Sequence, residues 1–183
     1  MAAALTHDVL EQARRGEPEA LTLIYQSLAG QVTGYLTARG VEDPDGTAQE
    51  VFLTVFSRLA EVTGGVDGLR RFTFSVAHAR MVDATRARAR APYVVEYDAG
   101  ADPRLEPSPQ DALLDQLESS HLSGVLDSIA SEQRECILLR VVAGMSVDET
   151  AEILGKTAGA VKQLQRRGLL AMRRSLEEAG EHA

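Results

Sequence analysis

The sequence predicts an all-α protein made of two small helical domains joined by an irregular acidic linker. Aromatic residues make up only 4% of the 183 residues and Trp is absent, so the core must consist mainly of Ala, Leu and Val. Apolar residues recur at steps of three and four over long stretches, which is the period of an amphipathic helix. Four of the six prolines fall within residues 92–109 and separate the two helical halves.

The first domain is predicted over residues 1–91 and contains three helices. The first helix covers residues 17–40, because Pro18 and its acidic neighbours favour a helix start and a glycine favours its end. A second helix begins near residue 45 or 47 and carries apolar side chains as far as Leu59. After a glycine-rich turn, a third helix runs from about residue 67 to residue 90.

The linker is predicted over residues 92–109 and the second domain over residues 110–183. Residues 92–135 contain two basic and ten acidic side chains, so the linker and the segment after it are strongly acidic. Ser108 and its neighbours are expected to cap a helix whose apolar side chains extend to residue 129. A further apolar segment follows and ends at Gly144.

A helix-turn-helix motif is predicted in the second domain. Ser146 and Glu149 form a capping box, in which each side chain bonds the backbone amide of the other residue. The helix that follows ends at Gly155, which permits a left-handed turn, and Thr157 can cap the next helix. Val161 is placed to pack back against the first helix. The second helix therefore protrudes and can enter a DNA major groove about 12 Å wide.

The charge is segregated along the chain. A formal net charge of −8 argues by itself against binding to nucleic acid, because phosphates attract cations. Residues 70–91, however, hold six basic residues and one acidic residue, and residues 156–174 hold six basic residues and no acidic one. Either segment alone could be an ordinary solvated helix face, but two of them on either side of an acidic stretch favour two DNA-binding surfaces.

The two basic segments suit different forms of DNA. Lys162, Gln163, Arg166 and Arg167 lie on the polar side of the predicted second helix of the motif and suit phosphates and base edges in duplex DNA. In the first segment cations alternate with two Phe residues, which suits single-stranded DNA, where bases stack on rings. At helical spacing, however, each Phe is more often a core residue than a stacking platform.

No catalytic or metal-binding signature is found, and neither a cofactor nor a metal is expected. The sequence has no Gly-rich phosphate loop and no nucleophile elbow. A lone Cys136 excludes an internal disulfide and a multi-Cys zinc site, and this residue is expected to be buried filler. No apolar run approaches the roughly 18 residues that span a bilayer, and the signal-peptide pattern is absent. A cytoplasmic, non-enzymatic protein without membrane insertion is therefore expected.

The order of these parts resembles the sigma factors of the bacterial sigma-70 superfamily, in particular the short extracytoplasmic-function (ECF) group, or group IV. The resemblance covers about residues 8–178, and its most specific segments are residues 152–155 and 159–162 in the helix-turn-helix. It implies a sigma-2 and a sigma-4 domain that bind core RNA polymerase, recognise the minus-10 and minus-35 promoter elements and promote DNA melting.

The resemblance implies roles for three groups of residues. The residues expected to contact the minus-35 element are Arg140, Thr157, Lys162, Gln163, Arg166 and Arg167. The residues expected to contact the minus-10 element are Arg70, Arg71, Phe72, Phe74, His78 and Arg80. The residues expected to contact core polymerase are Gln49, Glu50, Phe52, Leu53 and Phe56. Phe72 stands where the family commonly has Trp, so a promoter sequence is not carried over.

The resemblance also implies the partners. They are promoter DNA and core RNA polymerase, through the clamp helices of the beta-prime subunit and the flap of the beta subunit. By analogy with the family, the acidic linker runs through a positively charged channel of the polymerase. Anti-sigma partners are common in the family, although nothing in the sequence identifies one.

Two other interpretations stay open from the residues alone. A conventional helix-turn-helix regulator would use its N-terminal helical module to sense a ligand or to dimerise, and it would bind duplex DNA without polymerase. A small helical enzyme would use the linker as a lid, but it would need a clustered set of acids and bases, which the sequence lacks.

Overall fold

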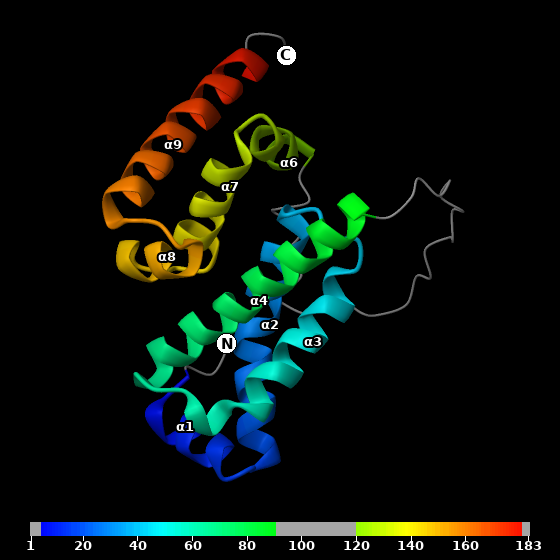
Figure 1. The fold of residues 1–183 in the computed structure, drawn as a ribbon, viewed down its shortest axis with the longest axis vertical. Helices are drawn as coiled ribbons and strands as arrows, with labels where there is room; N and C mark the ends of the chain where they lie inside the picture. The colour runs from blue at the N-terminus through cyan, green and yellow to red at the C-terminus, as the bar shows by residue number, and fades with distance from the viewer. Residues whose placement is uncertain (1–4, 91–119, 181–183) are drawn as a thin grey trace, which may run out of the picture.

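The computed structural model describes residues 5–90 and 120–180, and every regular element within these ranges is helical (Figure 1). The elements are α1 (His7–Arg14), α2 (Pro18–Ala38), α3 (Pro44–Ser57), the short 3-10 turn η1 (Leu59–Glu61), α4 (Gly65–Arg90), α6 (Ser120–Asp127), α7 (Ser131–Ile137), the π-helical turn η2 (Leu138–Val142), α8 (Val147–Leu154) and α9 (Ala158–Gly180). The predicted all-α fold is confirmed for this part of the chain. Within it, no helix combines the length and apolar character that crossing a membrane requires.

The three predicted helices of the first half correspond to α2, α3 and α4, which pack side by side with α1 (Figure 1). Helix α2 begins at Pro18, as expected. Helix α3 begins slightly before the expected position, because the Asp43 side chain accepts a hydrogen bond from the Gly46 amide at 2.8 Å and so caps the helix. The predicted linker, and the helix expected to begin near residue 108, lie mostly outside the described residues.

Helix α1 was not predicted from the sequence. The Thr6 hydroxyl caps it by accepting a hydrogen bond from the Val9 amide at 3.3 Å. Only Leu10 and Ala13 of this eight-residue helix are buried, so its apolar periodicity is too short to detect in the sequence. The helix covers the end of the core formed by α2 and α4.

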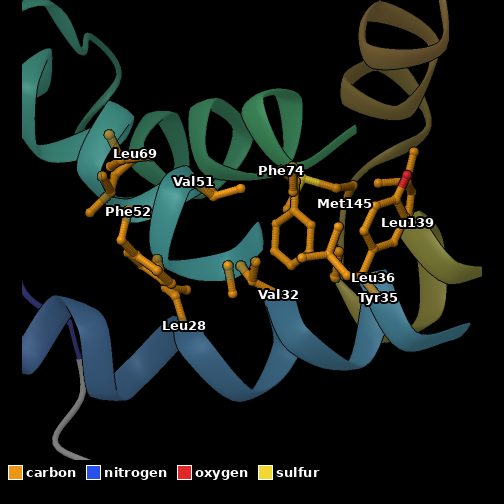
Figure 2. Close-up of a cluster of buried hydrophobic side chains, with 14 of the residues drawn as sticks. Leu28, Val32, Tyr35, Leu36, Val51, Phe52, Leu69, Phe74, Leu139 and Met145 are labelled. Atoms are coloured by element: carbon orange, nitrogen blue, oxygen red, sulfur yellow. The ribbon is translucent and has the colours of Figure 1, made fainter. Parts of the chain in front are cut away.

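The core of the first half lies between α2, α3 and α4 (Figure 2). The buried face of α2 presents Leu28 and Val32 to Val51 of α3 and to Leu69 of α4. Near the other end of α2, Tyr35 and Phe74 meet edge to face, with ring centroids 6.0 Å apart. Small aliphatic residues fill most of this core, as the low aromatic content predicts.

The second group of helices, α6 to α9 with η2, has a small buried cluster of its own and also shares the larger core of the first group. Leu139 of η2, and Met145 beyond it, belong to the same buried cluster as Tyr35 and Leu36 of α2, and Figure 2 shows these side chains together. The π-helical turn η2 directly follows α7 and ends before Gly144, which has φ +67°. A π-helical turn is uncommon and is often found where function requires it. Here it places Leu139 against α2.

Cys136 is completely buried, which confirms its predicted role as filler. Its Sγ donates to the Val161 carbonyl at 3.4 Å, and burial raises the pKa of the thiol. The thiolate is therefore scarce at neutral pH, and Cys136 is expected to react slowly with alkylating reagents.

Replacing the core ring of Phe74 tests this packing. Phe74→Ala is expected to lower the free energy of unfolding by about 3–5 kcal/mol, because it leaves a cavity beside Tyr35. Urea unfolding monitored by circular dichroism measures the loss. Leu53→Ala is the control, since Leu53 is 70% exposed and its truncation should change stability by less than about 0.5 kcal/mol. Comparable losses in the two variants would contradict the placement of Phe74 in the core.

Candidate nucleic-acid interface

The predicted helix-turn-helix is present and its local signals are confirmed. Ser146 and Glu149 form the capping box: the Glu149 amide donates to Ser146 Oγ at 3.2 Å, and the Ser146 amide donates to Glu149 Oε2 at 2.8 Å. Gly155 ends α8 in the left-handed region with φ 60°. Thr157 Oγ1 accepts from the Ala160 amide at 3.2 Å and caps α9. These contacts fix the angle between α8 and α9.

One side of α9 packs closely against α7 and α8. Val161 is completely buried with Ala151 and Cys136, as the spacing of the motif predicted. Gly168 lies so close to α7 that a β-carbon there would be 2.5 Å from Ile137 Cδ1, so no larger residue fits without movement. Lys156 Nζ forms an ion pair with Glu132 Oε1 at 2.7 Å. The opposite side of α9 is therefore presented rigidly to solvent.

The exposed side of α9 is a cationic surface, formed by Lys162, Gln163, Arg166 and Arg167. Within residues 5–90 and 120–180, no acidic side chain pairs with these three cations. Further along the same helix, by contrast, Arg173 is neutralised by Glu177 at 2.9 Å. Unpaired cations on a protruding helix can replace the counterions of DNA phosphates or bond to base edges.

Arg140 and Thr157, the other two residues expected at the minus-35 element, are engaged within the domain. Arg140 Nε donates to Gln165 Oε1 at 3.2 Å and its Nη1 donates to the Met145 carbonyl. The guanidinium thus ties η2 to α9, and its contact with a DNA phosphate stays a prediction. Thr157 is exposed, but its hydroxyl caps α9.

Three residues expected at the minus-10 element face the second group of helices. Arg70 Nη2 donates to the Ala143 carbonyl at 2.9 Å, and Arg71 Nε lies 3.8 Å from Glu152 Oε2. His78 Nδ1 lies 2.9 Å from Glu135 Oε1. Glu135 and Glu152 had no predicted role, because nothing in the sequence indicates that they approach α4.

The remaining minus-10 residues differ in exposure. Phe74 is completely buried against Tyr35, so the structure contradicts its predicted contact with DNA: it is a core residue. Phe72 is partly exposed, and the Arg58 guanidinium lies 5.5 Å from its ring centroid, a cation–π contact. Arg80 Nη1 lies 3.4 Å from Glu50 Oε2 on α3. Arg58 was not selected from the sequence, because it lies outside the basic segment.

The predicted polymerase-binding residues form one exposed face of α3, with one correction. Gln49, Glu50 and Leu53 are exposed and Phe56 is half-buried. Phe52 is buried, so its assignment to this surface is wrong. Its ring packs edge to face on Tyr25 of α2 with centroids 4.8 Å apart, and Tyr25 is 40% exposed. Tyr25 was missed because the helical period of α2 placed it among the core residues.

The described residues contain no group of three His, Cys, Asp or Glu side chains that could hold a metal ion. The titratable group with the clearest role in the motif is Glu149. The backbone hydrogen bond from Ser146 lowers the pKa of its carboxyl group, against a smaller opposing effect of burial. The folded state thus stabilises the carboxylate form of Glu149 relative to the protonated form.

The capping box is therefore expected to give pH-dependent stability. A carboxyl whose folded pKa is depressed contributes fully above its unfolded pKa of about 4.3, and the contribution is lost as the pH falls through the folded pKa. Glu149→Ala should be less stable than the unmodified chain at pH 7, and the difference should shrink below pH of about 4.3. Urea unfolding across this range measures it. Asp148→Ala on the same turn is the control, and an equal pH dependence in both variants would contradict the assignment.

Comparisons with known proteins agree with this geometry. The family model for Sigma-70, region 4 matches residues 125–174, which include α7, η2 and α8. The chain is 31% identical over 173 residues to the ECF RNA polymerase sigma factor SigK of Mycolicibacterium vanbaalenii, covering 92% of this chain and 87% of that protein. It is 28% identical over 176 residues to the ECF RNA polymerase sigma factor BldN of Streptomyces coelicolor, covering 93% of this chain and 66% of that protein.

A solved structure shares the fold. The structure of CnrH in complex with the cytosolic domain of CnrY resembles this chain with a TM-score of 0.67 at 19% sequence identity, covering 94% of this chain and 97% of CnrH. The resemblance seen in the sequence is thereby confirmed, and the chain belongs to the family of ECF RNA polymerase sigma factors.

Proposed function

We propose that this chain binds core RNA polymerase in the cytoplasm, directs it to a promoter with minus-35 and minus-10 elements, and helps to open the DNA. The observation that carries the proposal is the cationic surface of α9. Its Lys and Arg side chains are exposed and unpaired within the described residues, on a helix whose other side is fixed by Val161 and Gly168. A rigid, cationic second helix is what major-groove recognition requires.

Helix α4 supplies the proposed surface for the minus-10 element. Arg70, Arg71, His78 and Arg80 provide cations or hydrogen-bond donors along one helix, and the ring of Phe72 provides a flat face on which an unpaired base can stack. Stacking of single-stranded bases on an aromatic ring supports DNA opening, because it stabilises bases that have left the duplex. Arg58, above the Phe72 ring, joins this surface.

The exposed side of α3 supplies the proposed contact with the clamp helices of the polymerase. Leu53 is the most exposed of the large apolar residues in the described part of the chain. Half-buried Phe56 lies one turn further along α3, and the exposed Tyr25 of α2 packs on Phe52 beside Leu53 in the sequence. Apolar and aromatic residues surrounded by polar ones, here Gln49 and Glu50, are typical of a protein interface. The second domain is proposed to contact the flap of the beta subunit.

The chain is proposed to perform no chemistry of its own. Nucleotide addition belongs to the polymerase, and this chain contributes binding energy and position. An anti-sigma partner is a further proposal, supported by the structure of CnrH, which shares this fold and was solved in complex with the cytosolic domain of CnrY.

Run-off transcription with purified components tests the proposal. Core polymerase is incubated with promoter DNA with and without this chain, and a specific transcript is expected only when the chain is present. A gel shift with and without core polymerase tests the alternative of a conventional regulator. Tight binding of duplex promoter DNA by the isolated chain, with no dependence on polymerase, would favour that alternative.

Arg166→Ala is expected to weaken binding of the minus-35 element by about 1–3 kcal/mol if Arg166 bonds a base edge. The affinity of the holoenzyme for a labelled promoter fragment measures the loss. The matched control is Arg173→Ala on the same helix, since Arg173 is already neutralised by Glu177. Equal affinities for Arg166→Ala and the unmodified chain would reject the assignment.

Leu53→Ser is expected to weaken assembly with core polymerase at least tenfold without changing the fold, because Leu53 is exposed in the free chain. Fluorescence anisotropy of the labelled chain titrated with core polymerase measures assembly. Ala60→Ser changes an exposed residue of η1 outside this face and is the control. Unchanged assembly of Leu53→Ser would place the polymerase contact elsewhere.

A further inference from the structure

The proposed minus-10 surface is bounded on one side by the loop of residues 62–64, which connects η1 to α4. A cavity of about 300 Å³ lies beside the Phe72 ring. Val62 and Thr63 of this loop line the cavity, together with Arg71 and Phe72 of α4. The position of the loop therefore determines how much room a base has when it stacks on the ring.

Two glycines allow the loop to lie directly on the first turn of α4. Gly64 has φ +83°, and its carbonyl accepts a hydrogen bond from the Gly68 amide at 3.0 Å. A β-carbon at Gly68 would be 1.7 Å from the Thr63 carbonyl oxygen, so only glycine permits this close approach. A β-carbon at Gly64 would lie 3.9 Å from Arg71 Nη2, so the loop also reaches a cation of the proposed DNA surface.

Arg14 of α1 holds the start of this loop. Its Nη2 donates to the Val62 carbonyl, 48 residues further along the chain, and its Nη1 pairs with Glu11 Oε1 at 2.5 Å. Helix α1 also contacts η1 and α4, and Figure 1 shows it beside the turn that leads into α4. The guanidinium thus links the N-terminal helix to a residue that lines the cavity beside Phe72.

The burial of Arg14 is a poor source of stability. The side chain is only 25% exposed, and its Nε is buried without a hydrogen-bond partner among the described residues. A buried guanidinium that is not fully hydrogen-bonded carries a desolvation cost, which offsets part of what its other contacts contribute. The definite consequence of this side chain is the position of the Val62 carbonyl.

We infer that Arg14 is a positioning residue for minus-10 DNA, because it fixes the loop of residues 62–64 beside Phe72 before DNA binds. This inference rests on the proposed role of α4 in binding the minus-10 element. A loop that is already in place need not be ordered when a base stacks on the ring, so less binding free energy is lost. Arg14 acts through the loop and does not itself contact DNA.

Arg14→Gln tests the inference in the holoenzyme assembled from the full chain and core polymerase. The probe is a labelled single-stranded oligonucleotide that carries the minus-10 element of the promoter used for run-off transcription. Its affinity is expected to fall about two- to tenfold, the cost of ordering the loop on binding. Assembly with core polymerase, and binding of duplex minus-35 DNA, should stay unchanged.

The neighbouring arginine supplies the matched control. Arg15 is exposed and pairs with Glu17, two residues away, so Arg15→Gln should leave oligonucleotide affinity unchanged. Arg14→Lys keeps one cationic donor and should lose less affinity than Arg14→Gln. If Arg14→Gln does not fold by circular dichroism, Arg14→Lys is compared with Arg15→Lys in its place.

Gly64→Ala disturbs the same loop from its own backbone and leaves Arg14 unchanged. Alanine is strained at φ +83°, so the loop should shift and the affinity for the oligonucleotide should fall. Gly40→Ala is the control, since it introduces a similar strain at φ +70° beyond the end of α2, where a β-carbon meets open space.

A double-substitution cycle separates positioning from a general loosening of the structure. If Arg14 acts through the loop beside Phe72, Arg14→Gln should reduce oligonucleotide affinity much less in a chain that already carries Phe72→Ala. An equal reduction in both backgrounds would show that Arg14 acts elsewhere and would overturn the inference.

Failure of the inference can be told apart from failure of the proposed function. The inference alone is wrong if Phe72→Ala and Arg71→Ala weaken oligonucleotide binding while Arg14→Gln does not. It is also wrong if Arg14→Gln weakens polymerase assembly and minus-35 binding to the same degree. If Phe72→Ala and Arg71→Ala leave oligonucleotide affinity unchanged, the proposed role of α4 fails, and the positioning role of Arg14 fails with it.

Discussion

The packing of η2 on α2 is the contact on which the arrangement of the whole molecule depends. Leu139 and Met145 enter the same core as Tyr35 and Leu36, so burial of apolar surface holds the two groups of helices together. Apolar burial has little directional preference. Beside it lies a nearly buried polar cluster, in which Glu135 Oε1 is 2.9 Å from His78 Nδ1 and 3.9 Å from Arg39 Nη2. Polar contacts depend on direction, so this cluster favours one orientation of the two groups. Apolar burial thus holds the two groups of helices together, and the adjacent polar contacts favour their orientation.

The two basic segments are consequently in different states. Lys162, Arg166 and Arg167 of α9 are exposed and have no acidic partner among the described residues. Arg70 and Arg71 of α4, by contrast, contact groups of the second group of helices. The local charge of each surface, and not the net charge of the chain, therefore determines where an anion is attracted. The net charge of −8 hides this division.

The helix-turn-helix could be predicted closely because its signals are local. The Ser146 cap, the Gly155 turn and the Thr157 cap each act within about one helical turn, so residue type and spacing suffice to identify them. Helix α1 escaped detection because it is short and buries only two residues. The π-helical form of η2 has no pattern in the sequence, since it follows from how Leu139 packs on α2.

The sequence by itself determined the all-α class, the position of the helix-turn-helix and the segregation of charge, because periodicity, capping and composition are properties of neighbouring residues. Only the tertiary structure decided which aromatic rings are exposed at the surface and which are buried in the core. Phe52 and Phe74 are buried while Phe72 remains partly exposed, although all three lie on amphipathic helices. The structure also decided that Arg70 meets the Ala143 carbonyl, 73 residues away, because such a pairing depends on the packing of two distant helical groups.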